Sequence, residues 1–240
     1  MRALLKSSSA LVALIQAFRL VPADIRRFGW WLRRPHQIAT HLDRNPARKL
    51  QIGCGHNPLA GWLNTDFTPR SAGVVYLDAT RPFPFSDATF DFVFSEHVIE
   101  HLTYQNGQLL LREAWRVLKP GGSIRVATPN LLNLATLLDE PLDDRRRRYL
   151  RRAVERYMQE IGVEEPGFVF NNFIWGFGHI FVYDPKTLGI AMIAAGFADP
   201  ELKEISESAH PALAGLESHG KVVGEDLNAF ETMVMEARKP

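Results

Sequence analysis

The chain has 240 residues, of which 46% are hydrophobic and 23% are charged, and its formal net charge is +1. This composition suits one α/β domain with a real apolar core, and a net charge near zero gives no field that would attract nucleic acid or acidic partners. The single cysteine, Cys54, excludes an intramolecular disulfide and a zinc site built from cysteines. We therefore expect a protein of a reducing compartment, without a metal site.

Residues 1–47 are predicted to form a helical extension ahead of the main domain. Apolar residues recur on one helical face from Leu11 to Phe18, and two tryptophans follow among arginines. The simpler interpretation is that these helices cover the main domain. The alternative is a pair of interfacial helices, through which residues 1–40 place aromatic and arginine side chains on an anionic membrane surface.

The uncharged run from Ser7 to Phe18 also raises the question of a targeting signal. A bilayer span needs roughly 20 apolar residues, and no small-residue cleavage site follows this run. We expect neither a span nor a signal peptide. The predicted location is the cytoplasm, with contact at the inner face of the membrane as the alternative.

The next part of the chain alternates between strands and connections. Apolar and β-branched stretches predict strands at residues 49–52, 62–67, 74–78, 90–95 and 123–129. A helix is expected over about 109–118, ended by Pro120, Gly121 and Gly122. Strands that alternate with helices indicate a parallel sheet with right-handed crossovers.

The second half of the chain begins with a helical, basic stretch over residues 131–166. Its arginines are either a solvated face or a binding surface: they are Arg145 to Arg148, Arg151, Arg152 and Arg156. Asp184 and Pro185 then predict the start of a helix that Gly196 ends. The segment 230–237 predicts a last strand.

A glycine loop, Gly53-Cys54-Gly55, follows the first predicted strand. Glycines there allow a sharp turn and a close approach of the backbone to a ligand. The dinucleotide fingerprint needs a third glycine in this loop and an acid about 20 residues further on. Pro58 stands in the place of that glycine. Asp66 comes only eleven positions after Gly55. These spacings argue against a nicotinamide cofactor.

The segments LDATRPFPFSDATFDFVFSEHVIEHL and LREAWRVLKPGGSIRVATPN resemble the class I S-adenosylmethionine-dependent methyltransferases. The opening KLQIGCGHNPLAGWLNTD is similar to the branch that includes many bacterial cell-surface glycan methyltransferases. The resemblance implies a doubly wound, mostly parallel seven-stranded α/β sheet of the Rossmann-like type. It also implies a methyltransferase domain over residues 48–240, with a helical substrate-side insertion at about 131–180.

The resemblance implies how the cofactor S-adenosylmethionine would be held. The glycine loop would surround the methionine end, one carboxylate would accept from the ribose diol, and a second would accept from the adenine amino group. Taken alone, either carboxylate could instead be an ordinary strand-end turn residue. The cofactor residues are Gly53, Cys54, Gly55, Asp66 for the ribose, Asp78 for adenine, Ala79 through its backbone, and Ser95 and Glu96 at the end of the fourth strand.

Transfer of a methyl group to a hydroxyl needs a base, for which histidine is suited. His179 is our first candidate because it follows an aromatic loop, and His97 and His101 are expected at i, i+4 on a helix after the fourth strand, where His101 could equally be structural. Candidate substrate-binding residues are Asn171 and Asn172, which could instead cap a loop, and His219.

The leading functional hypothesis is O-methylation of a sugar, glycan or related small metabolite. One alternative is a methyltransferase that acts on RNA or protein through the arginines. The other is a catalytically silent binding subunit, suggested by Gln51 and Asn57 at positions where many relatives have an acid and a glycine. We expect a small-molecule or glycan partner and no nucleic acid.

Overall fold

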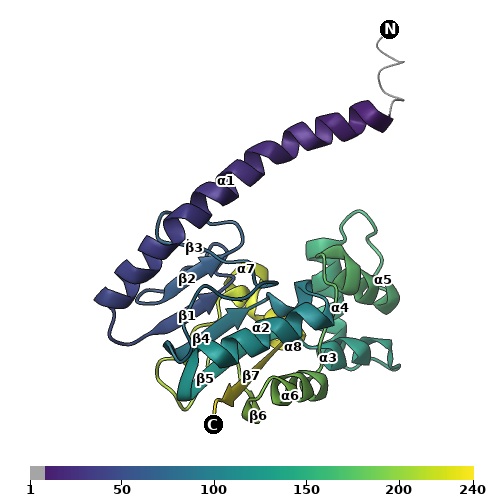
Figure 1. The fold of residues 1–240 in the computed structure, drawn as a ribbon. Helices are drawn as coiled ribbons and strands as arrows, with labels where there is room; N and C mark the ends of the chain where they lie inside the picture. The colour runs from purple at the N-terminus through teal and green to yellow at the C-terminus, as the bar shows by residue number, and fades with distance from the viewer. Residues whose placement is uncertain (1–8) are drawn as a thin grey trace.

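A seven-stranded sheet forms the centre of the computed structural model, which describes residues 9–240 and their side chains from residue 25 onward (Figure 1). The spatial order of the strands is β3-β2-β1-β4-β5-β7-β6, and only β7 runs antiparallel to its neighbours. This confirms the predicted doubly wound, mostly parallel sheet. The strands are β1 Lys49–Ile52, β2 Leu63–Asp66, β3 Val75–Tyr76, β4 Phe90–Glu96, β5 Leu118–Pro129, β6 Ala198–Lys203 and β7 Thr232–Arg238.

The order of the strands reverses between β1 and β4, which are parallel neighbours. In open α/β sheets, ligands bind at the carboxyl ends of the strands beside such a switch point. The central strands are apolar on both faces, as in β4, where Val93 and Phe94 belong to core clusters on opposite sides of the sheet. The sheet is therefore buried at its centre and open to a ligand at one edge.

Two helices cover one face of the sheet, α2 (Tyr104–Val117) and α6 (Pro185–Ala194). α2 begins five residues before the predicted start, where Thr103 Oγ1 accepts from the backbone N–H of Asn106. Asp184 caps α6 as predicted, accepting from the N–H groups of Lys186 and Thr187. The predicted stop after α2 was placed correctly, but Gly121 and Gly122 already belong to β5 because they pair with Lys239 at the end of the chain.

A helical unit follows the carboxyl end of β5. It contains α3 (Leu131–Ala135), α4 (Asp144–Tyr157), α5 (Pro166–Asn171) and a π-helical turn (Asn172–Gly176). With α8 (Glu225–Glu231), which leads into β7, these helices share an apolar cluster of their own, separate from the core of the sheet. The unit therefore stands beside the strand ends at which a ligand is expected. The short α7 (His219–Val223) lies just before α8 in the chain.

The N-terminal extension is one helix, α1 (Ser9–Arg44), rather than a pair. Its last turns cover the edge of the sheet, where Trp30 stacks on Tyr76 with ring centroids 6.3 Å apart, and Ile38 and Leu42 pack on the core. The expected apolar face from Leu11 to Phe18 lies outside the described side chains, as does the whole of the segment considered for a targeting signal.

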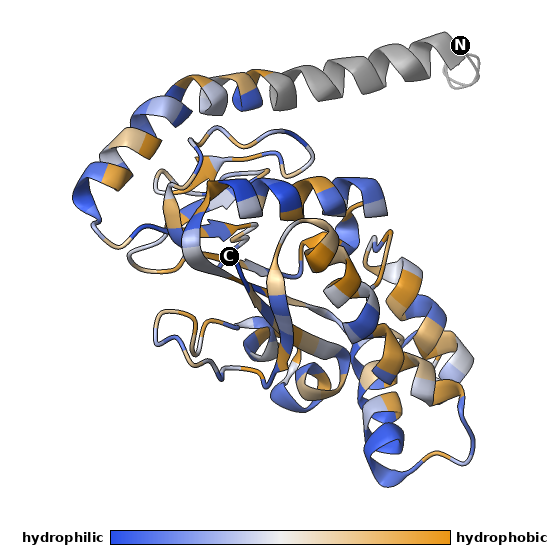
Figure 2. Ribbon diagram, turned by 60° about the horizontal axis from the view of Figure 1, so that its bottom comes forward, coloured by the Kyte–Doolittle hydropathy of each residue, from blue (hydrophilic) through white to orange (hydrophobic). Residues whose placement is uncertain are grey.

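Apolar and charged residues are mixed along the part of α1 whose side chains the structure describes (Figure 2). Four large apolar side chains there are exposed: Ile25, Phe28, Trp31 and Leu32. Within the described part of the chain, no helix has the length and apolar character needed to cross a lipid bilayer.

Candidate cofactor and catalytic site

A cavity of about 530 Å³ lies at the carboxyl ends of β1, β2 and β4, where the strand order reverses. This is within the volume range typical of small-molecule and cofactor sites. Apolar side chains make up part of its wall, and two acidic and two histidine side chains supply most of its polar groups. The residues that line it are Ile52, Gly53, Gly55, Asp66, Phe67, Leu77, Asp78, Ala79, Thr80, His97, Val98, His101 and Leu102.

The loop after β1 needs glycine at both of its predicted positions. Gly53 and Gly55 have φ angles of 70° and 52°, in the left-handed region that other residues avoid. At Gly53 a Cβ atom would also lie 2.2 Å from Cγ2 of Val98, on the segment after β4. The loop can therefore approach a ligand closely only because it carries no side chain there.

Asp66, at the end of β2, fixes the same loop from the other side. Its Oδ2 accepts from the N–H of Gly55 at 2.8 Å, and its Oδ1 accepts from the N–H of Thr68 at 2.7 Å. Each carboxylate oxygen can accept a further hydrogen bond, and the side chain lines the cavity. The carboxylate is thus held in place to receive a vicinal diol.

Asp78 and Ala79 line the cavity after β3. Oδ1 of Asp78 accepts from the N–H and the hydroxyl of Thr80, at 2.9 and 2.6 Å, and Oδ2 lies 3.3 Å from Nε of Arg81. These bonds turn the carboxylate to a fixed position at the cavity wall. Asp66 and Asp78 are twelve positions apart in the sequence, and both line this one cavity.

Gln51 occupies the position where many relatives have an acid, and it organises the loop. Its amide nitrogen donates to the carbonyl of Asn57, and its amide oxygen accepts from the N–H of Leu59. The buried Asn64 accepts from the same N–H of Leu59. Neutral amides therefore hold the far end of the glycine loop.

Three predicted cofactor residues do not line the cavity. Cys54 is buried, and burial together with the charge of Asp66 raises the pKa of its thiol to about 11. Ser95 is also buried, and its hydroxyl has no hydrogen-bond partner among the described residues. Ser95 points into the protein because successive residues of a strand face opposite ways. Cys54 lies on the loop after β1, where its thiol contacts the carbonyl of Gly55.

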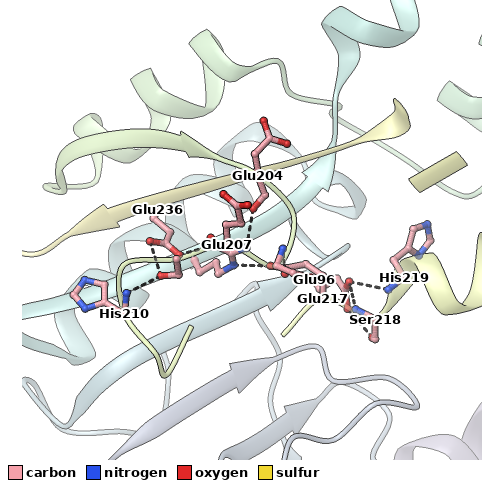
Figure 3. A network of polar contacts seen from close by, with 11 residues as sticks. Glu96, Glu204, Glu207, His210, Glu217, Ser218, His219 and Glu236 are labelled. Atoms are coloured by element: carbon pink, nitrogen blue, oxygen red, sulfur yellow. Dashed lines mark hydrogen bonds and ion pairs between the residues drawn. The ribbon is translucent and has the colours of Figure 1, made fainter. Parts of the chain in front are cut away.

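The prediction that Glu96 binds the cofactor is wrong, because its carboxylate does not line the cavity. The carboxylate instead accepts from the N–H and hydroxyl of Ser218, at 2.8 and 2.9 Å, and from the N–H of His219 at 2.9 Å (Figure 3). It therefore anchors the start of α7 to the end of β4. This contact joins residues more than 120 positions apart in the sequence.

A buried ion network holds the segment that leads to Ser218 (Figure 3). The guanidinium of Arg125 on β5 is completely buried and donates to Glu217 and Glu236, both at 2.5 Å. It also donates to the carbonyl of Glu207 at 2.7 Å. Arg125 thus ties the loop after β6 to the centre of the sheet.

His97 and His101 both line the cavity, but not on one helix as predicted. His97 has a φ of 50°, and a single 3-10 turn, Ile99–His101, follows it. Nδ1 of His97 lies 3.0 Å from Oε1 of Glu100, and its Nε2 lies 3.3 Å from the hydroxyl of Thr232. That hydroxyl donates to Asn228, so it accepts from the ring, and both nitrogens of His97 are engaged.

The charges around His97 favour its protonated form. Burial by itself would lower the pKa of His97, but the hydrogen bond and charge of Glu100, with the charges of Glu96 and Glu231, outweigh it and raise the pKa. Burial would likewise raise the pKa of Glu100, yet the contact with His97 lowers it. His97 is therefore suited to electrostatic stabilisation and not to accepting a proton.

His219 lies directly against His97, with ring centroids 3.8 Å apart. Its Nε2 is 3.4 Å from Glu231, whose other oxygen accepts from the hydroxyl of Tyr149 at 2.8 Å. The sequence interpretation missed Glu100, Glu231 and Tyr149. The three-residue spacing between His97 and Glu100 was the one available signal, because it places the two on the same side of a turn.

His179 and His101 form a second pair, with ring centroids 5.1 Å apart. His179 is only 8% exposed, and burial lowers its pKa. Its Nδ1 lies 2.7 Å from the carbonyl of Phe173, and Nδ1 of His101 lies 3.1 Å from the carbonyl of Gly178. A carbonyl only accepts, so each Nδ1 carries hydrogen and each neutral ring keeps a lone pair on Nε2.

Asn171, a predicted substrate-binding residue, and most arginines of the basic stretch have local partners. The amide of Asn171 donates to the carbonyl of Gly167 within its own helix, and Asn172 opens the π-helical turn. Five arginines of α4 contact neighbouring segments. Arg145 donates to the carbonyl of Ala229, Arg146 to those of Thr136 and Asp139, and Arg156 to that of Val222, and Arg151 and Arg152 lie beside Glu164 and Asp226.

Comparison with known proteins points to methyltransferases. Residues 64–126 match the model of the methyltransferase domain family. A probable S-adenosylmethionine-dependent methyltransferase of Mycolicibacterium smegmatis is 31% identical over 135 residues, covering 48% of this chain and 51% of that protein. The chain thus spans about half the length of the curated relative that it matches.

Two solved structures are similar over most of the chain. A methyltransferase from Archaeoglobus fulgidus is 20% identical, with a TM-score of 0.49 over 92% of this chain and 94% of that one. One from Mesorhizobium loti is 16% identical, with a TM-score of 0.49 over 86% and 97%. Neither likeness is close enough to bear on the reaction.

Proposed function

We propose that this chain is a class I S-adenosylmethionine-dependent methyltransferase and that it transfers the methyl group of that cofactor to a hydroxyl of a sugar, a glycan or a related small metabolite. The observation that carries the proposal is a shared wall. Asp66 and Asp78, which would hold the cofactor, line the same cavity as His101. The ring of His101 lies 5.1 Å from that of His179.

The chemistry needs few protein groups, because the sulfonium already activates the methyl. The acceptor oxygen forms a bond to the methyl carbon while the methyl–sulfur bond breaks, and the electron pair of that bond stays on sulfur. The hydroxyl proton must leave during this step. We place this activation at His101 and His179, whose Nε2 atoms have no hydrogen-bond partner among the described residues, and not at His97, whose two nitrogens are both engaged.

The class of acceptor is suggested by the helical unit beside the strand ends. Trp175 is 71% exposed, and Phe168 and Phe177 are also exposed. Phe177 lies 5.8 Å from the ring of His179, so this aromatic surface adjoins the histidine pair. Aromatic faces combined with a few polar groups suit the apolar faces and hydroxyls of a sugar ring. The π-helical turn that carries Trp175 is also a feature frequent at functional sites.

A methyl-transfer screen tests this proposal. The purified full chain is incubated with labelled S-adenosylmethionine and separate pools of sugars, lipid-linked glycans and RNA. We expect label in a sugar or glycan pool, and its loss from every pool in Asp66→Ala. Label that enters only the RNA pool, or no transfer to any pool, would reject the sugar, glycan or small-metabolite acceptor.

We also propose that α1 contacts an anionic membrane surface from the cytoplasmic side. Support comes from the exposed side chains of Ile25, Phe28, Trp31 and Leu32, which leave an apolar surface on a helix rich in arginine. Such a helix binds in the plane of the interface, with its arginines near lipid phosphates. This contact would hold the site near lipid-linked acceptors.

A further inference from the structure

The geometry points to a divalent metal site formed by Glu100, His101 and His179 at the wall of the cofactor cavity. One carboxylate oxygen and one ring nitrogen from each histidine lie within 4.8 Å of one another. That spacing is close to what one ion needs, because ligands held by bonds of about 2.0–2.2 Å lie about 3–4 Å apart, and small side-chain rotations would bring all three into contact. His101 lines the cavity, so an ion held here would face the bound cofactor and its acceptor.

The two histidines are oriented as metal ligands usually are. Metal-bound histidines donate their other ring N–H to a backbone carbonyl or a carboxylate, which fixes the tautomer and the plane of the ring. His101 donates from Nδ1 to Gly178, and His179 donates from Nδ1 to Phe173. The nitrogen left to each ring for a ligand is therefore Nε2, in the form that carries a lone pair.

Glu100 supplies the oxygen ligand. Its side chain is completely buried, so it has no contact with solvent. One oxygen lies 3.0 Å from Nδ1 of His97, and the other accepts from the hydroxyl of Thr128 at 3.1 Å. A carboxylate oxygen has two lone pairs, so both oxygens can still bind an ion. His97 and Thr128 would then orient this ligand from behind.

Two imidazole nitrogens and one carboxylate oxygen select the type of ion. Catalytic zinc sites use three such protein ligands and leave one position open for water or substrate. Magnesium and calcium prefer sets made only of oxygen. The site therefore fits Zn²⁺ or a similar first-row ion. The lone cysteine gave no sign of this site, so no metal was expected, and nothing in the sequence placed His179 beside Glu100.

The role of the ion rests on the proposed function. An acceptor hydroxyl bound at the open position would become more acidic, because a bound cation lowers the pKa of its oxygen ligands. The hydroxyl proton passes to solvent, the oxygen forms its bond to the methyl carbon, and the methyl–sulfur bond breaks. His101 and His179 would act through the ion they hold, as ligands.

Metal titration of the untagged full chain tests the site without any acceptor. The protein is stripped with a chelator, dialysed, and titrated with Co²⁺ by visible absorption and with Zn²⁺ by calorimetry. We expect one ion per chain. His101→Ala and His179→Ala should each weaken binding by at least about 100-fold, beyond the 10–100-fold typical of losing an outer partner. His36→Ala, an exposed histidine on α1, is the matched control and should bind like the parent.

His101 is exposed, so its replacement should leave the fold intact, which a melting curve verifies. The metal site is rejected if neither ion binds, or if binding is the same in His101→Ala and His179→Ala as in the parent. Methyl transfer by the metal-free protein would reject the role given to the ion and leave the proposed function standing. Stoichiometric metal binding without transfer to any hydroxyl pool would leave the metal site and reject the proposed function.

Discussion

The buried guanidinium of Arg125 allows a sharp test of what holds the site together. Arg125→Met keeps an unbranched apolar stem but removes the charge, so Glu217 and Glu236 lose the cation that they share inside the protein. The carbonyl of Glu207 loses its donor as well. The loop that leads to Ser218 and α7 should then loosen.

The expected size of the effect follows from the burial of all three side chains. Their exposed fractions are 0% for Arg125, 1% for Glu217 and 8% for Glu236, so solvent screening is weak. Removing one partner of a buried pair costs about 3–5 kcal/mol. For a chain of this size each kcal/mol lowers the melting temperature by about 2–4 °C, so we expect a drop of about 6–20 °C.

Thermal unfolding followed by circular dichroism measures this drop. The matched control is the variant that combines Arg125→Met with Glu217→Gln and Glu236→Gln, which removes the unpaired charges and should recover part of the stability, since neutral replacement of a whole buried ion set is often tolerated. If Arg125→Met melts within 2 °C of the parent, by our estimate of a negligible change, the network does not hold the loop.

Three further predictions concern the cofactor site, the helix α1 and the lone thiol. Asp66→Ala should weaken binding of S-adenosylhomocysteine by about 1.5–3 kcal/mol for each charged hydrogen bond lost, and unchanged calorimetric affinity with a lower melting temperature would make Asp66 structural. Replacing Phe28 and Trp31 by serine should abolish sedimentation with anionic vesicles and leave cofactor affinity unchanged; a parent protein that never sediments with them refutes the membrane contact. The thiol of Cys54, with a pKa of about 11, should be about one part in a thousand thiolate at pH 8. It should therefore react with a disulfide reagent far more slowly than in the unfolded chain, and gain reactivity only as the pH rises toward 11. Equal rates in the folded and unfolded chains would contradict its burial.

Local signals were sufficient for much of the fold. The strands around the glycine loop have apolar runs and turn residues at their ends, and Asp184 combines an N-cap with a proline in the first turn, so the elements they begin were predicted close to their observed positions. β6 was missed because its sequence, ADPELK, lies at the edge of the sheet and has no apolar alternation. Its pairing with β7 is a tertiary contact that no local pattern shows.

Part of the candidate site could also be predicted from the sequence, and part of it depends on tertiary contacts. Gly53, Gly55 and Asp66 stand where strand ends meet, so topology alone brings them together. Glu96 could not be predicted, because the partner that turns its carboxylate away lies more than 120 positions later. The left-handed backbone of His97 likewise changes a predicted helix into a bend, and this bend places Glu100 between His97 and the pair formed by His101 and His179.

Calorimetric titration of the purified full chain with S-adenosylhomocysteine, S-adenosylmethionine and NAD tests the central claim most directly. The cavity presents one carboxylate for a ribose diol and a second for an adenine amino group, beside a glycine loop that lacks the dinucleotide spacing. We predict one binding site for each S-adenosyl ligand and none for NAD. Binding of NAD without binding of either S-adenosyl ligand would contradict the account.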